Sequence, residues 1–420
     1  MRNLIILYKI AFLSVCTIVL TSCSEKKNDK DVRIIDIAGS VGKGRIIPLS
    51  EIASEVTYIP LETTDSSLVG NINSVLYEGG QIYIVHNTST VSVFDNNGKF
   101  IRKINRQGRG PEEYLKLMSG DMLEIDPDNR NIILLSLDTK LYEYTEDGVF
   151  VRKVQIPKIE GCRNYMNWGQ KISDNTYIAD VSSREPFYEY CAVVFDSLSN
   201  VKLMIPSPKI NYDEITGIIS QSEFRIVDCA RFTKFEDKVR IIYSNPEIIR
   251  SIDNGLRIDT VYTINYGEYK MTLSNKDGVT STSRIIIWLG SLLESKNYLY
   301  IWLGLNGLAH EPVEQQYTDH TGKQVTFQNT NSLALFNKKT GDLTLMNQPL
   351  KGKMGFKDDI EGGPVFWPRT VSSQEYLVAA YTAVEFKDFA ENFKCSRKIK
   401  DMAAGLNEND NPVIAIVKLK

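Results

Sequence analysis

One hairpin pattern that is written twice constrains this chain more than any other feature. An alternating apolar segment, a polar turn closed by glycine and a second alternating segment fill residues 94–104, and the same pattern fills residues 144–154. Each copy consists of an aromatic residue, three turn residues, a glycine and, one residue later, Phe-(Ile/Val)-Arg-Lys. This arrangement is typical of an antiparallel β-hairpin. Its return after 50 residues indicates a supersecondary unit copied around or along an axis.

The chain divides into six units of this kind. They cover about residues 72–104, 121–154, 168–206, 229–264, 285–346 and 364–419. In the third unit the aromatic residue is Phe195, and we expect Asn200 to take the place of the glycine. Four short strands per unit predict four-stranded antiparallel blades, and six such units predict an all-β, six-bladed β-propeller.

The last unit is one strand short of a complete blade. An unpaired strand edge and an unclosed ring are both costly. A spare apolar strand, at residues 56–61, precedes the first unit. We therefore expect this N-terminal strand to pair with the last blade, whose inner strands come from the C-terminus, and so to close the ring.

Two segments interrupt the strand pattern. An insertion at about residues 306–331, in the fifth unit, contains a hairpin-like sequence at residues 316–327. Within residues 384–405, Phe386 and Phe389 follow helical spacing and basic residues come later. We predict one helix there, packed on the propeller rim; a helix that binds a partner is the alternative.

Residues 1–22 have the features of a secretion signal. Arg2 and Lys9 come before a short apolar core, which is about half as long as a membrane-spanning helix. The sequence Leu-Thr-Ser-Cys that ends at Cys23 resembles the bacterial lipobox, in which the cysteine becomes lipidated. An ordinary signal peptide with a chance cysteine after it is the alternative.

A lipid on Cys23 would anchor the chain to a membrane. The residues after it are charged and lack apolar periodicity, so we predict a flexible tether over residues 23–44 and the propeller over residues 45–420. Ser24, directly after the cysteine, resembles lipoproteins that are sent to the outer membrane. We expect a palmitate-bearing lipoprotein of the cell envelope, in the outer membrane, with its face undetermined.

Composition argues against nucleic acid as a partner. The net charge is −3 and the isoelectric point is about 5.9, so there is no basic field to attract phosphates. The cysteines outside the signal and lipid sites are widely spaced and form no CxxC pair, which leaves thiols and disulfides both open. They are Cys162, Cys191, Cys229 and Cys395.

A glycine-rich loop after the first unit is the first candidate ligand site. Arg106 and Arg109 offer two guanidinium groups that can hold a carboxylate or a sulfate of an acidic sugar in bidentate fashion. The loop also contains Glu112, Glu113 and Tyr114. The structural alternative, which we favour, is a Gly-Pro turn that redirects the chain between blades, with the tyrosine as an anchor.

A second candidate is an acidic loop at residues 357–363. It contains Asp358, Asp359 and Glu361, but their spacing is not that of a calcium loop, so we predict no metal. A solvated loop, or carboxylates paired with Arg369, is the favoured interpretation. Nearby Trp367, with Trp288 and Trp302, offers a platform on which sugars stack, although packing between blades is the more common role of such residues.

No catalytic group can be assembled from the sequence. The three histidines form neither HxH nor HExxH, and there is no GxSxG. No fingerprint of a cofactor is present, so we predict none.

The chain resembles a family of six-bladed β-propeller lipoproteins that are abundant in Bacteroides-type gut bacteria and related in blade pattern to NHL-repeat and TolB-like propellers. The resemblance depends on residues 56–63, 94–100, 108–114 and 358–368 and extends over everything after the tether. Glu112 stands where this family often has a third glycine. The family has no settled activity, so the resemblance implies the fold and the location rather than the function.

We therefore predict a membrane-anchored, non-enzymatic binding or scaffold module that captures a glycan or a peptide at the cell envelope. Two alternatives stay open. A glycan lyase or hydrolase would need the arginines of the glycine-rich loop and the carboxylates of the acidic loop to converge on one end of the channel. A structural partner of an outer-membrane complex would use the rim helix and the insertion for its contacts.

Overall fold

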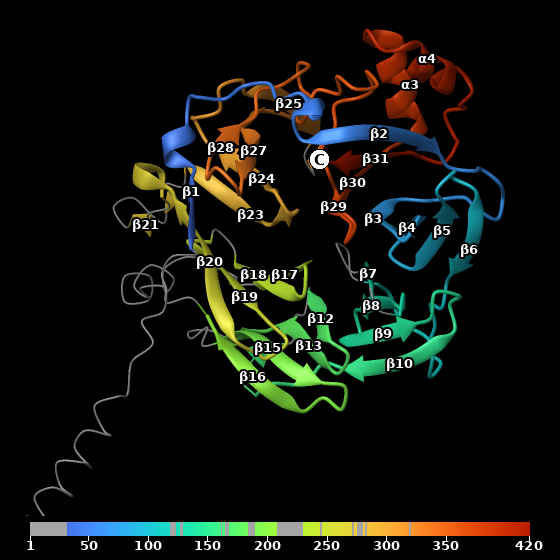
Figure 1. Cartoon of the computed structure of the whole chain (residues 1–420), viewed down its shortest axis with the longest axis vertical. Coiled ribbons are helices and arrows are strands. Elements are labelled where there is room, and N and C mark those ends of the chain that lie inside the picture. The colour runs from blue at the N-terminus through green and yellow to red at the C-terminus, as the bar shows by residue number, and fades with distance from the viewer. Residues whose placement is uncertain are drawn as a thin grey trace, which may run out of the picture.

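Six β-sheets stand in a ring around a central axis, and this arrangement confirms the predicted six-bladed β-propeller (Figure 1). The computed structural model describes residues 32–117, 123–126, 129–160, 162–163, 168–183, 190–207, 230–243, 246–270, 273–274, 280–281, 284–318 and 321–420. The signal segment and Cys23 lie outside this range. Among the described residues, none of the helices has both the length and the apolar character needed to cross a bilayer.

Each blade contains four antiparallel strands in the order in which the chain makes them, except the last blade. Blade 1 is β3 (Ile72–Glu78), β4 (Gln81–His86), β5 (Thr90–Asp95) and β6 (Phe100–Ile104); blade 2 is β7 (Leu123–Ile125), β8 (Ile132–Ser136), β9 (Lys140–Tyr144) and β10 (Phe150–Gln155). Blade 3 is β12 (Gly169–Ser173), β13 (Thr176–Asp180), β15 (Tyr190–Asp196) and β16 (Val201–Pro206); blade 4 is β17 (Ala230–Phe235), β18 (Lys238–Tyr243), β19 (Ile248–Ile252) and β20 (Ile258–Asn265). Blade 5 is β23 (Ile285–Glu294), β24 (Tyr298–Leu305), β27 (Asn331–Asn337) and β28 (Leu343–Leu345). Blade 6 is β29 (Thr370–Val371), β30 (Tyr376–Tyr381), β31 (Val413–Leu419) and β2 (Ala53–Pro60).

Strand β2 closes the ring as predicted. It pairs antiparallel with β31, in a continuous register from Val56 opposite Val417 to Pro60 opposite Val413. Its two faces are buried in different clusters: Tyr58 packs with blade 6 and its helices, whereas Ile59 packs with blade 1. A sheet between two neighbours must bury both faces, and the consecutive apolar residues Tyr58 and Ile59 of β2 meet this requirement.

The folded domain begins earlier than residue 45, where the sequence analysis placed it. Strand β1 (Arg33–Asp36) lies in the segment predicted as tether and pairs in parallel with β20, as a fifth strand on the outer edge of blade 4. Ile35 and Ile37 are fully buried there. A charged sequence hid this strand, because of its two apolar residues only Ile35 faces the core, whereas Ile34 is exposed.

The hairpin turn of the two sequence copies recurs in four blades, and an aspartate or threonine side chain holds it. The Asp95 carboxylate accepts hydrogen bonds from the N–H groups of Asn97 (2.8 Å) and Lys99 (2.9 Å). Asp196, Asp253 and Thr145 hold the corresponding turns in the other three blades. The side chain therefore supplies an acceptor for backbone N–H groups of the turn that would otherwise be left to water.

The residue in the left-handed conformation of this turn differs between blades. Gly98 has a φ of +80°, and a Cβ there would lie 2.3 Å from the Pro60 carbonyl oxygen. In blade 3 the equivalent residue is Ser199, with a φ of +67°, so the expectation that Asn200 replaces the glycine was wrong by one position. In blade 4 it is Leu256, with a φ of +61°.

Two helices occupy the segment where one was predicted. They are α3 (Ala383–Asn392) and α4 (Arg397–Ala404), and they pack on blade 6 through buried residues of both, including Phe386 and Ile399. The Ser396 hydroxyl accepts a hydrogen bond from the Ile399 N–H and so begins a new helix, which explains the break.

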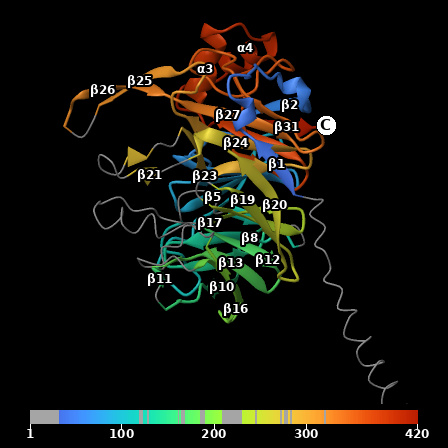
Figure 2. The same ribbon diagram turned by 90° about the vertical axis from the view of Figure 1, so that its left-hand side faces the viewer.

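The long insertions all lie at one end of the propeller, which we call the loop end. At this end the second strand of a blade leads to the third, and the fourth strand leads to the next blade. The hairpin β25 (Val313–Thr318) and β26 (Gln324–Asn329), both helices, and the short pairs β11 (Cys162–Arg163) with β14 (Ser182–Ser183) and β21 (Leu273–Ser274) with β22 (Thr280–Ser281) are inserted there. Figure 2 shows β25, β26 and β21 projecting from the same side of the ring. The opposite end carries tight turns.

Two of the four remaining cysteines have described side chains. The Cys191 thiol is buried and lies 3.5 Å from the Ile205 carbonyl oxygen, and the Cys395 thiol lies 3.7 Å from the Ala390 carbonyl oxygen. The side chain of Cys162 and the whole of Cys229 lie outside the described part of the chain.

His86 is a buried imidazole in blade 1. Its Nδ1 accepts a hydrogen bond from the Gly70 N–H (3.1 Å), so its Nε2 carries the proton and donates to the Ser92 hydroxyl (2.9 Å). Burial, with a smaller contribution from the Lys103 charge, lowers the pKa of His86 to about 4. The folded protein therefore holds this histidine neutral.

Lowering the pH is expected to destabilise the protein through His86. Below a pH of about 6.5 the unfolded imidazole binds a proton that the folded one refuses until about pH 4, so the free energy of unfolding falls by about 2 kcal/mol by about pH 5. Urea unfolding at about pH 7 and pH 5, for the wild type and for His86→Gln, measures this contribution because glutamine does not titrate. The same pH dependence in both proteins would contradict it.

Candidate functional site

A cavity of about 260 Å³ lies where blades 5, 6 and 1 meet around the axis. The first strands of these blades are neighbours there: β23 contacts β29, and β29 contacts β3. The cavity is lined by Asn73, Ser74, Val75, Leu293, Tyr300, Trp302, Trp367, Pro368, Arg369 and Thr370. Its volume is slightly below the range of about 300–1,000 Å³ that drug-sized ligands occupy.

Trp302 is the most unusual residue of this lining. It lies in β24 between the buried residues Ile301 and Leu303, yet it is 44% exposed. The pairing of β23 with β24 explains this, because the register passes from Ile287 opposite Leu303 directly to Leu292 opposite Ile301, so four residues of β23 are inserted at the level of Trp302. Such a bulge re-aims a side chain, and here it leaves an indole uncovered at the cavity.

Trp367 supplies a second aromatic wall, and its position is fixed. Its ring stacks on Phe356, with the ring centroids 6.0 Å apart and the planes 16° from parallel. The buried Tyr300 meets it edge-on at 6.2 Å. Because these contacts already hold the indole, a ligand that packs on it loses little additional side-chain freedom.

Arg369 adds a positive charge to the lining. Its backbone is held by a hydrogen bond from its N–H to the Val378 carbonyl oxygen (2.7 Å), and its side chain is exposed. The next residue, Thr370, ties blade 6 to blade 1 through a hydrogen bond from its hydroxyl to the Val75 carbonyl oxygen (2.6 Å). The cavity therefore has walls held by hydrogen bonds and ring contacts, and one exposed cation.

The glycine-rich loop is a structural joint between blades 1 and 2. Tyr114 is fully buried; its hydroxyl donates to the Ser89 carbonyl oxygen (2.6 Å) and accepts from the Arg106 N–H (3.2 Å). Burial raises the pKa of Tyr114 to about 12. The Glu113 carboxylate accepts from the Gly110 N–H (2.8 Å), and the Tyr144 hydroxyl donates to the Glu112 carbonyl oxygen (2.8 Å). These contacts fit the structural alternative given above for this loop.

The acidic loop holds the closing strand β2. Asp358 is buried and accepts four hydrogen bonds, from the Tyr58 hydroxyl and from the N–H groups of Ile360, Glu361 and Gly363, at 2.7 to 3.0 Å. A Cβ on Gly363 would lie 2.3 Å from the Tyr58 oxygen, so only glycine allows this approach. Four donors occupy both oxygens of Asp358, which leaves little for a cation.

The other two carboxylates of the acidic loop have partners at the ring closure as well. Asp359 accepts from the Ser50 N–H (2.9 Å) and hydroxyl (2.6 Å). Burial works to raise the pKa of Asp359, but these hydrogen bonds outweigh it and hold the pKa below its ordinary value. Glu361 pairs with Lys398 of α4 at 3.1 Å. This loop and the glycine-rich loop therefore contact different parts of the ring, and their charged residues do not form one site.

Two of the ten ligand-binding candidates from the sequence, Trp367 and Arg369, line the cavity. Trp302, which the sequence analysis assigned to core packing, joins them. Its Trp identity in an apolar strand was the available signal, but the bulge opposite it could not be read from the sequence. Within the described ranges, no group of three or more His, Cys, Asp or Glu side chains is placed to hold a metal ion.

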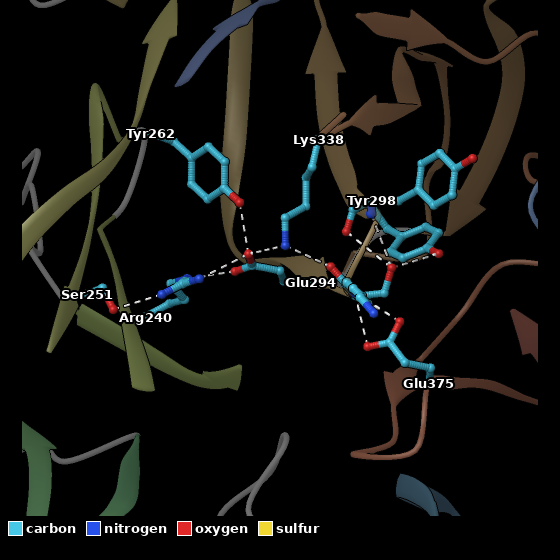
Figure 3. Close-up of polar contacts among 10 residues, drawn as sticks. Arg240, Ser251, Tyr262, Glu294, Tyr298, Lys338 and Glu375 are labelled. Carbon is cyan, nitrogen blue, oxygen red and sulfur yellow. Dashed lines mark hydrogen bonds and ion pairs between the residues drawn. The ribbon is translucent and has the colours of Figure 1, made fainter. Parts of the chain in front are cut away.

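Charged groups at the end of the propeller opposite the loop end join neighbouring blades. In the largest cluster, shown in Figure 3, the Glu294 carboxylate accepts hydrogen bonds from Arg240 (2.7 and 3.1 Å), from Tyr262 (2.8 Å) and from Lys338 (2.8 Å). Burial alone would raise the pKa of Glu294, but the two cations hold it below its ordinary value. Other carboxylates at the same end are Glu78 with Ser373, Glu146 with Arg102 and Arg130, Asp126 with Lys171, and Glu375 with the Lys296 N–H. These groups join neighbouring blades and are not at the cavity.

The comparison with protein families identifies the chain. The family described as "Domain of unknown function (DUF4934)" matches residues 32–418, which is almost all of the described structure. This chain belongs to the DUF4934 family. The match begins one residue before β1, in agreement with the earlier start of the folded domain. Among curated proteins, none matches this DUF4934 chain.

One solved structure supports the fold of this DUF4934 protein, and a second is more distantly similar. A "Putative exported protein" from Bacteroides fragilis NCTC 9343 superposes with a TM-score of 0.63 and 17% identity, over 92% of this chain and 99% of the other. A member of the DUF4221 family from Bacteroides vulgatus ATCC 8482 gives a TM-score of 0.48 and 13% identity, over 88% of this chain and 97% of the other. At these identities the likeness concerns the fold alone.

Proposed function

We propose that this DUF4934 protein is a binding module of the cell envelope, held to the outer membrane by a lipid on Cys23, and that it captures a glycan or a peptide in the cavity at its axis. The observation that carries the proposal is Trp302, an indole that the fold leaves uncovered beside a second, immobilised indole. Aromatic walls with a few polar groups are the common composition of small-ligand sites.

Three features of the chain support the location. The lipobox-like sequence places a cysteine directly after an apolar signal core. Nine residues lie between Cys23 and Arg33, the first residue of β1, so the tether is about half as long as the sequence analysis expected. At about 3.3–3.6 Å per residue it reaches at most about 35 Å, which keeps the ring near the membrane surface. The B. fragilis structure, whose printed name says exported, is compatible with this location.

Replacing Trp302 by alanine is expected to weaken binding of the captured ligand by about tenfold or more, because central aromatic residues are frequent hot spots of binding. Screening a panel of polysaccharide fragments and peptides by calorimetry with the wild-type protein identifies the ligand, and the variant is then titrated with it. Since Trp302 is exposed, the melting temperature should stay nearly unchanged.

Phe393→Ala is the matched control for this test. Phe393 is 39% exposed, and it lies between α3 and α4, away from the cavity. Its removal should leave binding unchanged. A ligand that binds wild type and Trp302→Ala equally well would show that the cavity is not the site, and turnover of any substrate by the purified protein would overturn a purely binding role.

One observation favours a second candidate, a structural partner of an outer-membrane complex. The hairpin β25–β26 pairs with no other described strand and projects from the loop end (Figure 2). A projecting two-stranded ribbon is marginally stable alone and gains stability from a partner. Co-purification from solubilised membranes, with and without residues 313–329, distinguishes this role from that of a free-standing binder.

A further inference from the structure

The polar groups of the axial cavity are unbalanced in charge. Its lining contains one cation, Arg369, and neither an aspartate nor a glutamate. From this imbalance we propose that the cavity takes an anionic saccharide unit, that is, a sugar ring that carries a carboxylate or a sulfate group. The inference depends on the proposed binding function and specifies its ligand.

Arg369 differs from the other arginines that are close to the ring's joints. Arg130, Arg152 and Arg240 each pair with a glutamate at 2.5 to 2.8 Å. In the part of the chain that the structure describes, Arg369 forms no ion pair, and its only hydrogen bond is that of its backbone N–H. A guanidinium left without a carboxylate at a cavity is matched by the planar oxygens of a carboxylate or by those of a sulfate, which it holds with two parallel hydrogen bonds.

The other polar side chains of the lining differ in what they offer a ligand. The Asn73 side-chain oxygen accepts from the Thr88 N–H (2.7 Å), and the Asn73 amide NH₂ can donate to a ligand. The Thr370 hydroxyl gives its proton to the Val75 carbonyl oxygen, so toward a ligand it can only accept. Asn73 and Arg369 therefore supply donors at the cavity, and donors of this kind favour a ligand that carries anionic oxygens.

The aromatic walls account for the saccharide part of the ligand. One face of a sugar ring presents C–H groups and packs on an indole, while its edge carries the polar substituents. Trp302 supplies an uncovered face and Trp367 a fixed one, and Arg369 lies two residues after Trp367. The volume of about 260 Å³ admits about one sugar unit with its charged substituent, so a longer chain would leave the cavity toward solvent.

Calorimetry with the full chain and three probes tests the inference. The probes are trigalacturonate, its fully methyl-esterified form, which has the same skeleton without charge, and a sulfated galactose trisaccharide. We expect at least one of the two charged probes to bind about 10- to 100-fold more tightly than the ester, since a hydrogen bond to a charged group is worth this much. The two charged probes show whether the anion is a carboxylate or a sulfate.

Two arginine variants test which side chain recognises the anionic group of the probe. Arg369→Gln should abolish the preference for the charged probe and leave the ester's affinity unchanged. Arg109→Gln, in the glycine-rich loop, is the matched control and should keep the preference. Loss of the preference in Arg109→Gln instead, or equal binding of charged and neutral probes to the wild type, overturns the inference while the binding function stands. If peptides bind at Trp302 and no saccharide does, the inference is also wrong; if no glycan or peptide binds, the proposed function fails with it.

Discussion

A chain shortened to begin at Glu62, and therefore without β2, is expected to be unable to close the ring and to aggregate instead of unfolding cooperatively. Among the buried side chains that the deletion removes are four in β2 or directly after it, those of Val56, Tyr58, Ile59 and Leu61. At about 1.5–3 kcal/mol each they contribute about 6–12 kcal/mol, which is comparable with the whole stability of a typical domain, about 5–15 kcal/mol. The deletion also leaves β31 as an unpaired edge, a template for association between chains.

Size-exclusion chromatography and thermal unfolding measure this effect. The matched control begins at Gly44 and lacks β1 but keeps β2. It loses the buried Ile35 and Ile37, so its melting temperature should fall, but a single cooperative transition and a monomeric elution volume should persist. A stable monomer from the chain that begins at Glu62 would show that closure by β2 is dispensable.

Glu294→Ala is expected to lower the free energy of unfolding by about 3–5 kcal/mol, because it leaves two buried cations without their carboxylate. Arg240 and Lys338 are 5% and 8% exposed, and both also lie over the ring of Phe235, at 4.9 and 3.8 Å. The cluster joins blade 4 to blade 5, so its loss affects the packing of two sheets. Equilibrium unfolding in urea measures the change.

Asp401→Ala is the control for this prediction. Asp401 forms an ion pair with Arg397 on the surface of α4, where both side chains are at least 70% exposed. Such a pair contributes about 0–1 kcal/mol, so its removal should be nearly silent. A loss below about 1 kcal/mol for Glu294→Ala would mean that the buried cations find other partners. Arg240→Met combined with Lys338→Met in the Glu294→Ala background should then recover part of the stability if the unpaired charges are the cause.

Much of the fold could be predicted because the repeat is written in apolar alternation and turn chemistry. The copies at 94–104 and 144–154 predicted the repeating blade, and the missing strand in the last unit predicted that the N-terminal strand closes the ring. The weaker copies were harder, since their turns depend on a side chain and not on glycine: Asp196 with Ser199, and Asp253 with Leu256. An aspartate at the end of the third strand, as its last residue (Asp196) or directly after it (Asp253), was the signal that the glycine pattern obscured.

The site was less accessible to prediction, for a physical reason. Arginines and carboxylates stand out in a sequence, and they drew attention to the glycine-rich loop and the acidic loop. In these two loops, however, Tyr114 and Asp358 use their polar atoms to hold the backbone of the ring. Trp302 is distinguished by an indole that its neighbours leave partly exposed. Arg369 is distinguished by a guanidinium that pairs with no carboxylate in the described part of the chain. Both features depend on which blades become neighbours. Three separate parts of the chain, around residues 73, 302 and 369, meet at the cavity only after the ring has closed.

The pairing of β2 with β31 also determines when this protein can finish folding. Strand β2 is synthesised before blade 1, whereas its partner β31 follows more than 350 residues later, since Pro60 lies opposite Val413. Until β31 has formed, β2 lacks its partner and the row of completed blades has an unpaired edge at each end. Pairing between strands so far apart in the sequence is slow to form. During that interval, association with another chain through these edges competes with completion of the ring.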